Sequence, residues 1–160
     1  MCWGPVRLLD GDHPACLRLL VAAALLLLSG CVSELPRIDT GRVQMSAAPE
    51  ANMDSPVAVD LVFILEGDAV AGIANLSAGQ WFRDKEQLML AYPTGLRVQS
   101  FELVPRRSIT YALTSKDEEG VAALIFANYA SPGTHRARVD RLKSVNLRLG
   151  RNTFTIEPGP

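Results

Sequence analysis

The sequence predicts a mainly β protein, namely a β-sandwich with one helical insertion after its first core strand. About seven short strand-like runs, separated by turn residues, follow residue 55, and this pattern is typical of a two-sheet sandwich. One longer stretch shows helical spacing, and an apolar run that ends at a cysteine precedes them all. We therefore expect a signal peptide over residues 1–30, a lipidated cysteine with a flexible linker over 31–55, and a sandwich domain over 56–160.

The N-terminal part has the layout of a bacterial lipoprotein signal. Arg7 and Arg18 supply positive charge, Leu19–Leu28 is apolar, and the small residues Ser29-Gly30 directly precede Cys31. A secretory signal requires positive charge, an apolar stretch of about 7–15 residues and small residues at the cut. We expect cleavage before Cys31 and a lipid on its thiol. Two alternatives stay open: a signal cut elsewhere, and a membrane-spanning helix, for which this run covers only about half of the ~30 Å hydrocarbon core.

Composition excludes several classes of function. The chain has 16 basic and 17 acidic residues, for a net charge of −1, which argues against a nucleic-acid-binding protein. Of its three cysteines, Cys2 and Cys16 lie in the expected signal and Cys31 carries the lipid. No thiol is then left for a disulfide, a metal site or a nucleophile. The fold must rest on an apolar core, for which about 130 residues suffice.

The segment Val32–Ser55 is expected to be a flexible linker. It has few large apolar residues, two prolines and several alanines, a composition that gives little reason to fold. A flexible chain of this length spans roughly 25–30 Å on average and at most ~80 Å. That reach would hold a domain clear of the lipid headgroups. Only Gly41–Met45 shows a weak strand pattern.

The first core strand and the helical insertion come next. Val57–Leu65 is a β-branched and apolar run, as expected of a buried strand. A helix is predicted over Ser77–Ala91, because Ser77 can cap it, Gln80 occupies the capping-box position and large apolar residues recur at helical spacing. Pro93-Thr94-Gly95 ends this helix.

The rest of the chain is strand-like. Val121–Ala130 is the most apolar run and should be central, whereas Leu96–Val104 alternates with a slip near Ser100 of the kind that a bulge causes. Ser115–Gly120 is predicted to be a charged loop. The other expected strands are Ser108–Thr114, Thr134–Leu142 and a closing hairpin of Val145–Leu149 with Asn152–Ile156.

Residues for catalysis are scarce. His135 is the one histidine after the signal, and a histidine beside Ser131-Pro132-Gly133 is expected to be a solvated turn residue. Asp117-Glu118-Glu119 is expected to be a solvated loop rather than a cation site, and no group of ligands has metal-binding spacing. We therefore expect no enzymatic activity, no metal and no cofactor.

Two surface features carry alternative interpretations. A basic cluster could meet an acidic partner or lipid headgroups, or could be an ordinary charged face that protects an edge strand. Trp81-Phe82 could both pack under the preceding loop, or one could be an exposed interface anchor, because adjacent helical residues point about 100° apart. The basic cluster consists of Arg136, Arg138, Arg141, Lys143, Arg148 and Arg151.

Short segments in a fixed order suggest a known family. The lipobox at Cys31 is followed by a Trp81-Phe82 helix, the strand end Glu102-Leu103-Val104-Pro105 and the apolar strand Ala123-Leu124-Ile125-Phe126-Ala127-Asn128-Tyr129. Over Ser55–Ile156 this layout resembles the outer-membrane lipoprotein of type VI secretion systems, the TssJ-like family.

The resemblance implies a fold, a location and a partner. The implied fold is a transthyretin-like or Ig-like sandwich, and the implied location is the outer membrane facing the periplasm, in keeping with Val32 after the lipidated cysteine. The implied partner is the periplasmic part of a large inner-membrane secretion subunit, with no small-molecule substrate. Partner contact in the family lies between the first two core strands, which here gives Glu66, Gly67, Asp68, Ala69, Val70, Ala71, Gly72, Ile73, Ala74 and Asn75.

The main hypothesis is thus a lipid-anchored assembly protein of a trans-envelope secretion complex. The alternative is a periplasmic ligand-binding or chaperone-type lipoprotein of another envelope machine. The two differ in the interior, since the assembly protein needs a filled core and the ligand-binding protein a deep apolar pocket.

Overall fold

The structure is a computed structural model that describes residues 37–159. Within this range the chain forms eight strands and three helices. The strands are β1 (Arg42–Ala47), β2 (Val57–Ile64), β3 (Leu96–Leu103), β4 (Ser108–Ala112), β5 (Ala122–Asn128), β6 (Arg136–Arg138), β7 (Ser144–Leu149) and β8 (Phe154–Pro158). The helices are α2 (Gly67–Ile73), α3 (Ala78–Ala91) and α4 (Ser115–Glu118).

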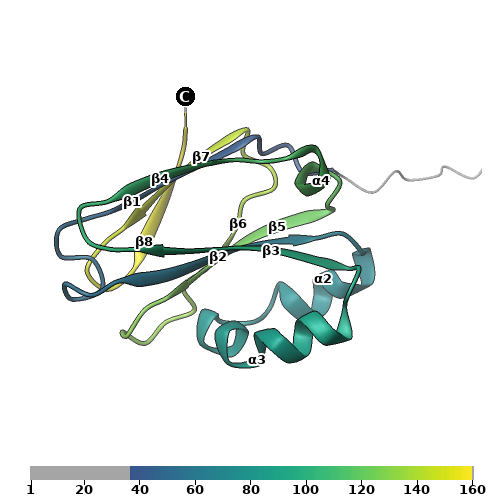
Figure 1. Cartoon of the computed structure of the whole chain (residues 1–160), viewed down its shortest axis with the longest axis horizontal. Coiled ribbons are helices and arrows are strands. Elements are labelled where there is room, and N and C mark those ends of the chain that lie inside the picture. Colours follow the sequence, from purple (N-terminus) through teal and green to yellow (C-terminus); the bar gives the residue numbers. More distant parts are fainter. Residues whose placement is uncertain (1–36, 160) are drawn as a thin grey trace, which may run out of the picture. The chain divides into compact units, whose positions relative to one another are not determined.

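The strands make two four-stranded sheets, with the orders β4-β1-β7-β8 and β3-β2-β5-β6. Figure 1 shows the sheets facing each other, with α2 and α3 against the outer side of the second one. Paired strands run antiparallel, except that β1 and β7 are parallel, with Val43 opposite Val145. The predicted β-sandwich is confirmed.

Strand β2 lies inside the second sheet and is buried on both faces. Leu61 and Phe63 point into the core between the sheets, while Val62 and Ile64 point into a second core under the helices. Strand β5 alternates in the same way and pairs with β2. Because both faces are covered, these two segments are continuous apolar runs, which is why sequence alone located them and predicted a central position for β5.

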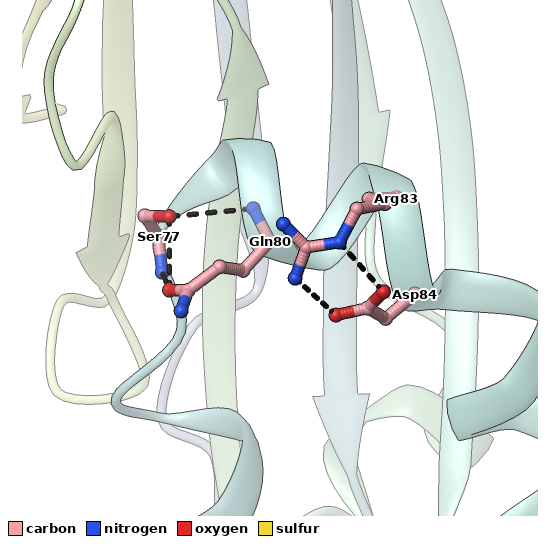
Figure 2. A network of polar contacts seen from close by, with 4 residues as sticks. All are labelled: Ser77, Gln80, Arg83 and Asp84. Atoms are coloured by element: carbon pink, nitrogen blue, oxygen red, sulfur yellow. Dashed lines mark hydrogen bonds and ion pairs between the residues drawn. The ribbon is translucent and has the colours of Figure 1, made fainter.

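The predicted helix Ser77–Ala91 is confirmed, together with its capping box. Figure 2 shows Ser77 Oγ accepting from the Gln80 backbone N–H at 3.3 Å, while Gln80 Oε1 accepts from the Ser77 N–H at 2.8 Å. These bonds satisfy two donors that a helix start otherwise leaves unpaired. One turn further on, Arg83 and Asp84 form an exposed ion pair with a 2.7 Å contact.

Different segments of the chain form the two ends of the sandwich. At the N-terminal end, the Ile38 N–H donates to the Gly120 carbonyl at 3.1 Å, and the Val121 N–H donates to the Ile64 carbonyl at 2.7 Å. The chain therefore enters beside the end of β2, where α2 begins. The opposite end, called the distal end, is made of the turns over residues 48–56, 104–107, 129–135 and 150–153.

The predicted linker, Val32–Ser55, includes residues that belong to the folded domain. Ile38 and Thr40 are buried, Thr40 Oγ1 donates to the Val139 carbonyl at 2.7 Å, and β1 lies between β4 and β7 in its sheet. The weak strand signal at Gly41–Met45 was correct, and the expectation of a flexible linker up to residue 55 was wrong. The strand was hard to recognise because its buried residues, Val43, Met45 and Ala47, include only one β-branched side chain.

Two further expectations need correction. The register between β2 and β3 is unbroken from Val57 opposite Leu103 to Ile64 opposite Leu96, so the expected bulge near Ser100 is absent from this pair. The predicted charged loop Ser115–Gly120 contains α4, and the predicted partner-binding segment contains α2, so the described domain has two helices beyond the expected insertion. The closing hairpin is confirmed as β7 and β8.

Candidate partner-binding segments

The predicted partner-binding segment, Glu66–Asn75, is mostly helical. Its helix α2 begins after Glu66, whose Oε1 accepts from the Thr94 hydroxyl at 2.8 Å, and Asp68 Oδ1 accepts from the Ala69 N–H at 2.9 Å. Ala69 and Ile73 are buried in the core under the helices. The segment is therefore ordered, with one face packed against the sheet.

The exposed residues of the segment Glu66–Asn75 are small or polar. Ala71, Gly72 and Asn75 are exposed, and the Asn75 side chain donates to the Ala71 carbonyl at 3.2 Å. The segment also follows β2, which is the second strand of the domain. The connection between the first two strands is instead the distal loop, residues 48–56.

The distal loop has a strained backbone. Three consecutive non-glycine residues have positive φ, namely Asn52 at 45°, Met53 at 55° and Asp54 at 63°. Each residue in the left-handed region costs roughly 1–2 kcal/mol. Strain of this kind persists where surrounding contacts enforce it, and it concentrates at functional sites.

The buried side chain of Asn52 enforces that conformation. Its Nδ2 donates to the Pro56 carbonyl at 2.9 Å, and its Oδ1 accepts from the Ala130 N–H at 2.9 Å. The Asn52 backbone N–H donates to the Gly150 carbonyl at 3.2 Å. One residue therefore joins three turns of the distal end into a rigid unit.

The distal end presents apolar side chains to solvent. Met53 is 47% exposed at the tip of the distal loop, and Val104, in another distal turn, is 43% exposed. An exposed apolar side chain on a rigid loop is suited to protein–protein contact, because little conformational entropy is lost on binding. This loop could have been identified from the sequence by its position between the first two strands. That identification required β1 to be recognised as a strand.

Trp81 and Phe82 both pack against the core. Trp81 is fully buried and stacks on Phe126 with ring centroids 5.1 Å apart, and Phe82 is half-buried against the same cluster. The indole of Trp81 donates to Asp60 at 2.8 Å, and Lys85 approaches the same carboxylate at 2.8 Å. Of the two interpretations, packing under the preceding segment is correct, so this aromatic pair is no interface anchor.

The basic cluster is partly paired within the molecule. Arg138 and Arg141 contact the buried carboxylate of Asp140 at 2.6 and 3.4 Å, and the Arg136 guanidinium donates to the Leu76 carbonyl at 3.0 Å. The hydrogen bond to Asp140 raises the pKa of Arg138, ahead of the opposing effect of burial. These contacts favour a structural role for this part of the cluster over an acidic-partner surface.

Asp117 departs from the expected solvated loop. It is buried, and its Oδ2 accepts from the Tyr111 hydroxyl at 2.7 Å and from the Thr114 backbone and hydroxyl at 2.9 and 2.7 Å. Burial opposes ionisation, but the bonds from Thr114 and Tyr111 and the charge of Arg97 together lower the pKa of Asp117. Burial and the bond to Asp117 raise the pKa of Tyr111 to about 12. The Thr114–Asp117 spacing is a second capping box, which the sequence contained.

His135 is buried rather than solvated. Its ring lies 4.8 Å from that of Tyr129, and its Nε2 is 2.9 Å from the Ser131 carbonyl, which requires the proton on Nε2. Burial also raises the pKa of Tyr129 to about 12. Over residues 37–159, no group of three or more His, Cys, Asp or Glu side chains is arranged to hold a metal.

Cys31 and the signal peptide lie outside the described residues. Among the helices that the structure does describe, none combines the length and apolar character needed to cross a membrane.

Solved structures share this fold. The chain resembles the type VI secretion lipoprotein TssJ1 from Pseudomonas aeruginosa with a TM-score of 0.55 and 20% identity, over 78% of this chain and 98% of that one. It resembles Lip from Serratia marcescens, a membrane-bound component of the type VI secretion system, with a TM-score of 0.52 and 10% identity, over 73% and 97%. A third match is a chain in a structure of the TssM C-terminal domain from EAEC, with a TM-score of 0.55 and 12% identity, over 74% and 97%.

No protein-family model matches the sequence, and no curated protein matches it. The solved structures nevertheless define the fold class, which is a β-sandwich that this chain shares with solved type VI secretion lipoproteins. More narrowly, the described domain has the TssJ-type lipoprotein fold that the sequence resemblance implied.

Proposed function

We propose that the protein is an outer-membrane lipoprotein that anchors a type VI secretion-like complex by binding the periplasmic part of a large inner-membrane subunit. The observation that carries this proposal is that the domain matches almost the whole of two solved type VI lipoproteins, 98% and 97% of their chains. The lipobox that ends at Cys31 supports it independently. A structure of a TssM domain among the matches suggests a TssM-type partner.

Anchoring through Cys31 would hold the domain close to the membrane. Cys31 precedes Arg37, where the described domain begins, by six residues. Even fully extended, six residues span only about 20 Å. Each buried CH₂ of an acyl chain contributes about 0.8 kcal/mol, so more than one chain gives stable attachment.

For partner contact we propose the distal loop, residues 48–56, as the first candidate. The family resemblance places contact between the first two strands, and with β1 recognised this is the loop that Asn52 holds and Met53 exposes. The exposed face of Glu66–Asn75 is the second candidate. The two lie at opposite ends of β2, so single substitutions can separate them.

The alternative, a ligand-binding or chaperone-type lipoprotein, has less support. The space between the sheets is filled by fully buried side chains that include Met45, Leu61 and Leu147. A hollow of about 120 Å³ lies on the sheet β4-β1-β7-β8 and has mostly polar walls that include Gln44, Asn146 and Glu157. A filled core is what the assembly protein requires.

The anchoring is tested by Cys31→Ser in the full chain. The variant should fold, remain periplasmic and leave the outer-membrane fraction, with Cys16→Ser as the control that keeps wild-type fractionation. Sedimentation with outer membranes at the wild-type level would show that Cys31 carries no anchoring lipid.

A further inference from the structure

The last turn of α3 exposes two large apolar side chains. Leu90 is 73% exposed and Met89 is 42% exposed, and both are among the most exposed large hydrophobic residues of the described domain. The last turn of α3 contains no basic residue. Met89 and Leu90 would therefore bind another surface through apolar contact rather than through charge.

This turn lies at the N-terminal end of the sandwich. Helix α3 begins near the distal end, where the Ala78 N–H donates to the Thr134 carbonyl at 2.7 Å, and it runs towards Gly95. The Gly95 carbonyl accepts from the Leu65 N–H at 2.8 Å, directly after β2 ends. Figure 1 shows the end of α3 on the same side of the domain as the start of the described chain.

We propose that Met89 and Leu90 insert into the headgroup region of the membrane that holds the protein, so that the C-terminal turn of α3 is a second point of membrane contact. The proposal rests on lipidation of Cys31, which is part of the proposed function. In this proposal Met89 and Leu90 contact lipid and not a protein partner.

The short chain before the domain indicates that the surface in contact with Met89 and Leu90 is a lipid membrane. With about 20 Å of extended chain at most between Cys31 and Arg37, the N-terminal end of the sandwich stays near the membrane. A short tether gives the second contact a high effective concentration, so two side chains suffice although they could not bind a membrane alone. Leucine and methionine at the edge of a polar surface are suited to shallow insertion.

Two contact points would fix the orientation of the sandwich. Anchoring at the N-terminal end alone leaves the domain free to rotate, whereas a second contact through α3 directs the distal end away from the membrane. Met53 and the rest of the distal loop would then face the periplasm, the direction from which an inner-membrane partner approaches. The exposed face of α2, at the N-terminal end, would face the bilayer.

Depth-dependent quenching tests the proposal. The full-length Leu90→Cys variant is expressed in cells so that it is processed and lipidated. The cysteine at position 90 is then labelled with an environment-sensitive fluorophore, and the protein is reconstituted into phosphatidylethanolamine and phosphatidylglycerol vesicles that contain brominated lipid. Met53→Cys at the distal end is the matched control, since it is also an exposed, apolar site. The probe at residue 90 should be quenched several-fold more strongly than the probe at residue 53, and 0.5 M salt should not reverse the effect.

The outcomes separate this inference from the proposed function. Vesicle binding with equal, weak quenching at both sites would overturn membrane contact through α3 and leave anchoring intact. Stronger quenching at residue 53 would overturn it by showing the reverse orientation. A wild-type protein that fails to float with vesicles would overturn the anchoring and, with it, this proposal. Leu90→Asp gives a label-free check, since it should lower the fraction of lipidated protein protected from protease at the end of α3.

Discussion

The indole nitrogen of Trp81 donates a 2.8 Å hydrogen bond to the Oδ2 atom of Asp60, a carboxylate that is only 1% exposed in the middle of β2. This bond fastens α3 to the sheet at a defined position. Lys85, one turn along the helix, contacts the same oxygen at 2.8 Å, so α3 places both a hydrogen-bond donor and a positive charge on this carboxylate. A buried carboxylate without such partners would be costly.

Replacing Trp81 with phenylalanine should therefore destabilise the domain. Trp81→Phe keeps an aromatic ring against Phe126 but removes the donor to Asp60, and a hydrogen bond to a buried charge contributes about 1.5–3 kcal/mol. Arg83→Ala is the control, because the Arg83–Asp84 pair is exposed and screened by solvent, so its loss should leave the stability close to that of wild type. Urea unfolding measures both, and equal stability of Trp81→Phe and wild type would show that the bond to Asp60 is unimportant.

Alkaline pH should weaken the fold through two tyrosines. The pKa values of Tyr111 and Tyr129 are raised from 10.0 to about 12 in the folded state. Between these values the folded state holds more protons than the unfolded state, so the free energy of unfolding falls as the pH rises through this window. Tyr111→Phe and Tyr129→Phe should each flatten the decline, as read from the urea midpoint between pH 9 and pH 12. An unchanged slope in both variants would contradict the assignment.

Two glycines should respond in opposite ways to alanine. A Cβ on Gly120 would lie 2.7 Å from Ile38 Cδ1 and 3.0 Å from the Ile64 carbonyl, whereas a Cβ on Gly79 would meet nothing within 4 Å. Gly120→Ala should therefore cost about 1–3 kcal/mol by overpacking. Gly79→Ala, inside α3, should raise stability by about 0.5–1 kcal/mol. Thermal unfolding checks both, and a neutral Gly120→Ala would show that the N-terminal segment can move aside.

The core of the fold could be predicted from the sequence because its signals are local. The continuous apolar run of β2 reflects burial on both faces, and Ser77 with Gln80 marks the start of α3. Strand β1 was underestimated because its stability comes from pairing with β4 and from a parallel pairing with β7, about a hundred residues later. No local pattern reveals a partner at that distance.

The candidate site was harder to predict for the same reason. Once β1 is missed, the loop between the first two strands is assigned to Glu66–Asn75 instead of residues 48–56. The small residues of Glu66–Asn75 do not reveal that Ala69 and Ile73 anchor α2 in the core under the helices. The burial of Asp117 and His135 likewise depends on tertiary contacts that spacing alone does not show.

We propose that the protein binds a large inner-membrane subunit through its distal loop. The direct measurement is calorimetric titration of the mature chain with the periplasmic domain of the TssM-type subunit, for wild type, Met53→Arg and Gly72→Arg. Both sites are exposed, and they lie on the first and second candidate segments respectively. We expect binding by wild type and Gly72→Arg and at least about tenfold weaker binding, equivalent to about 1.4 kcal/mol, by Met53→Arg. Loss of binding only in Gly72→Arg would contradict the distal loop as the contact, and no binding by the wild-type chain would contradict the assembly function itself.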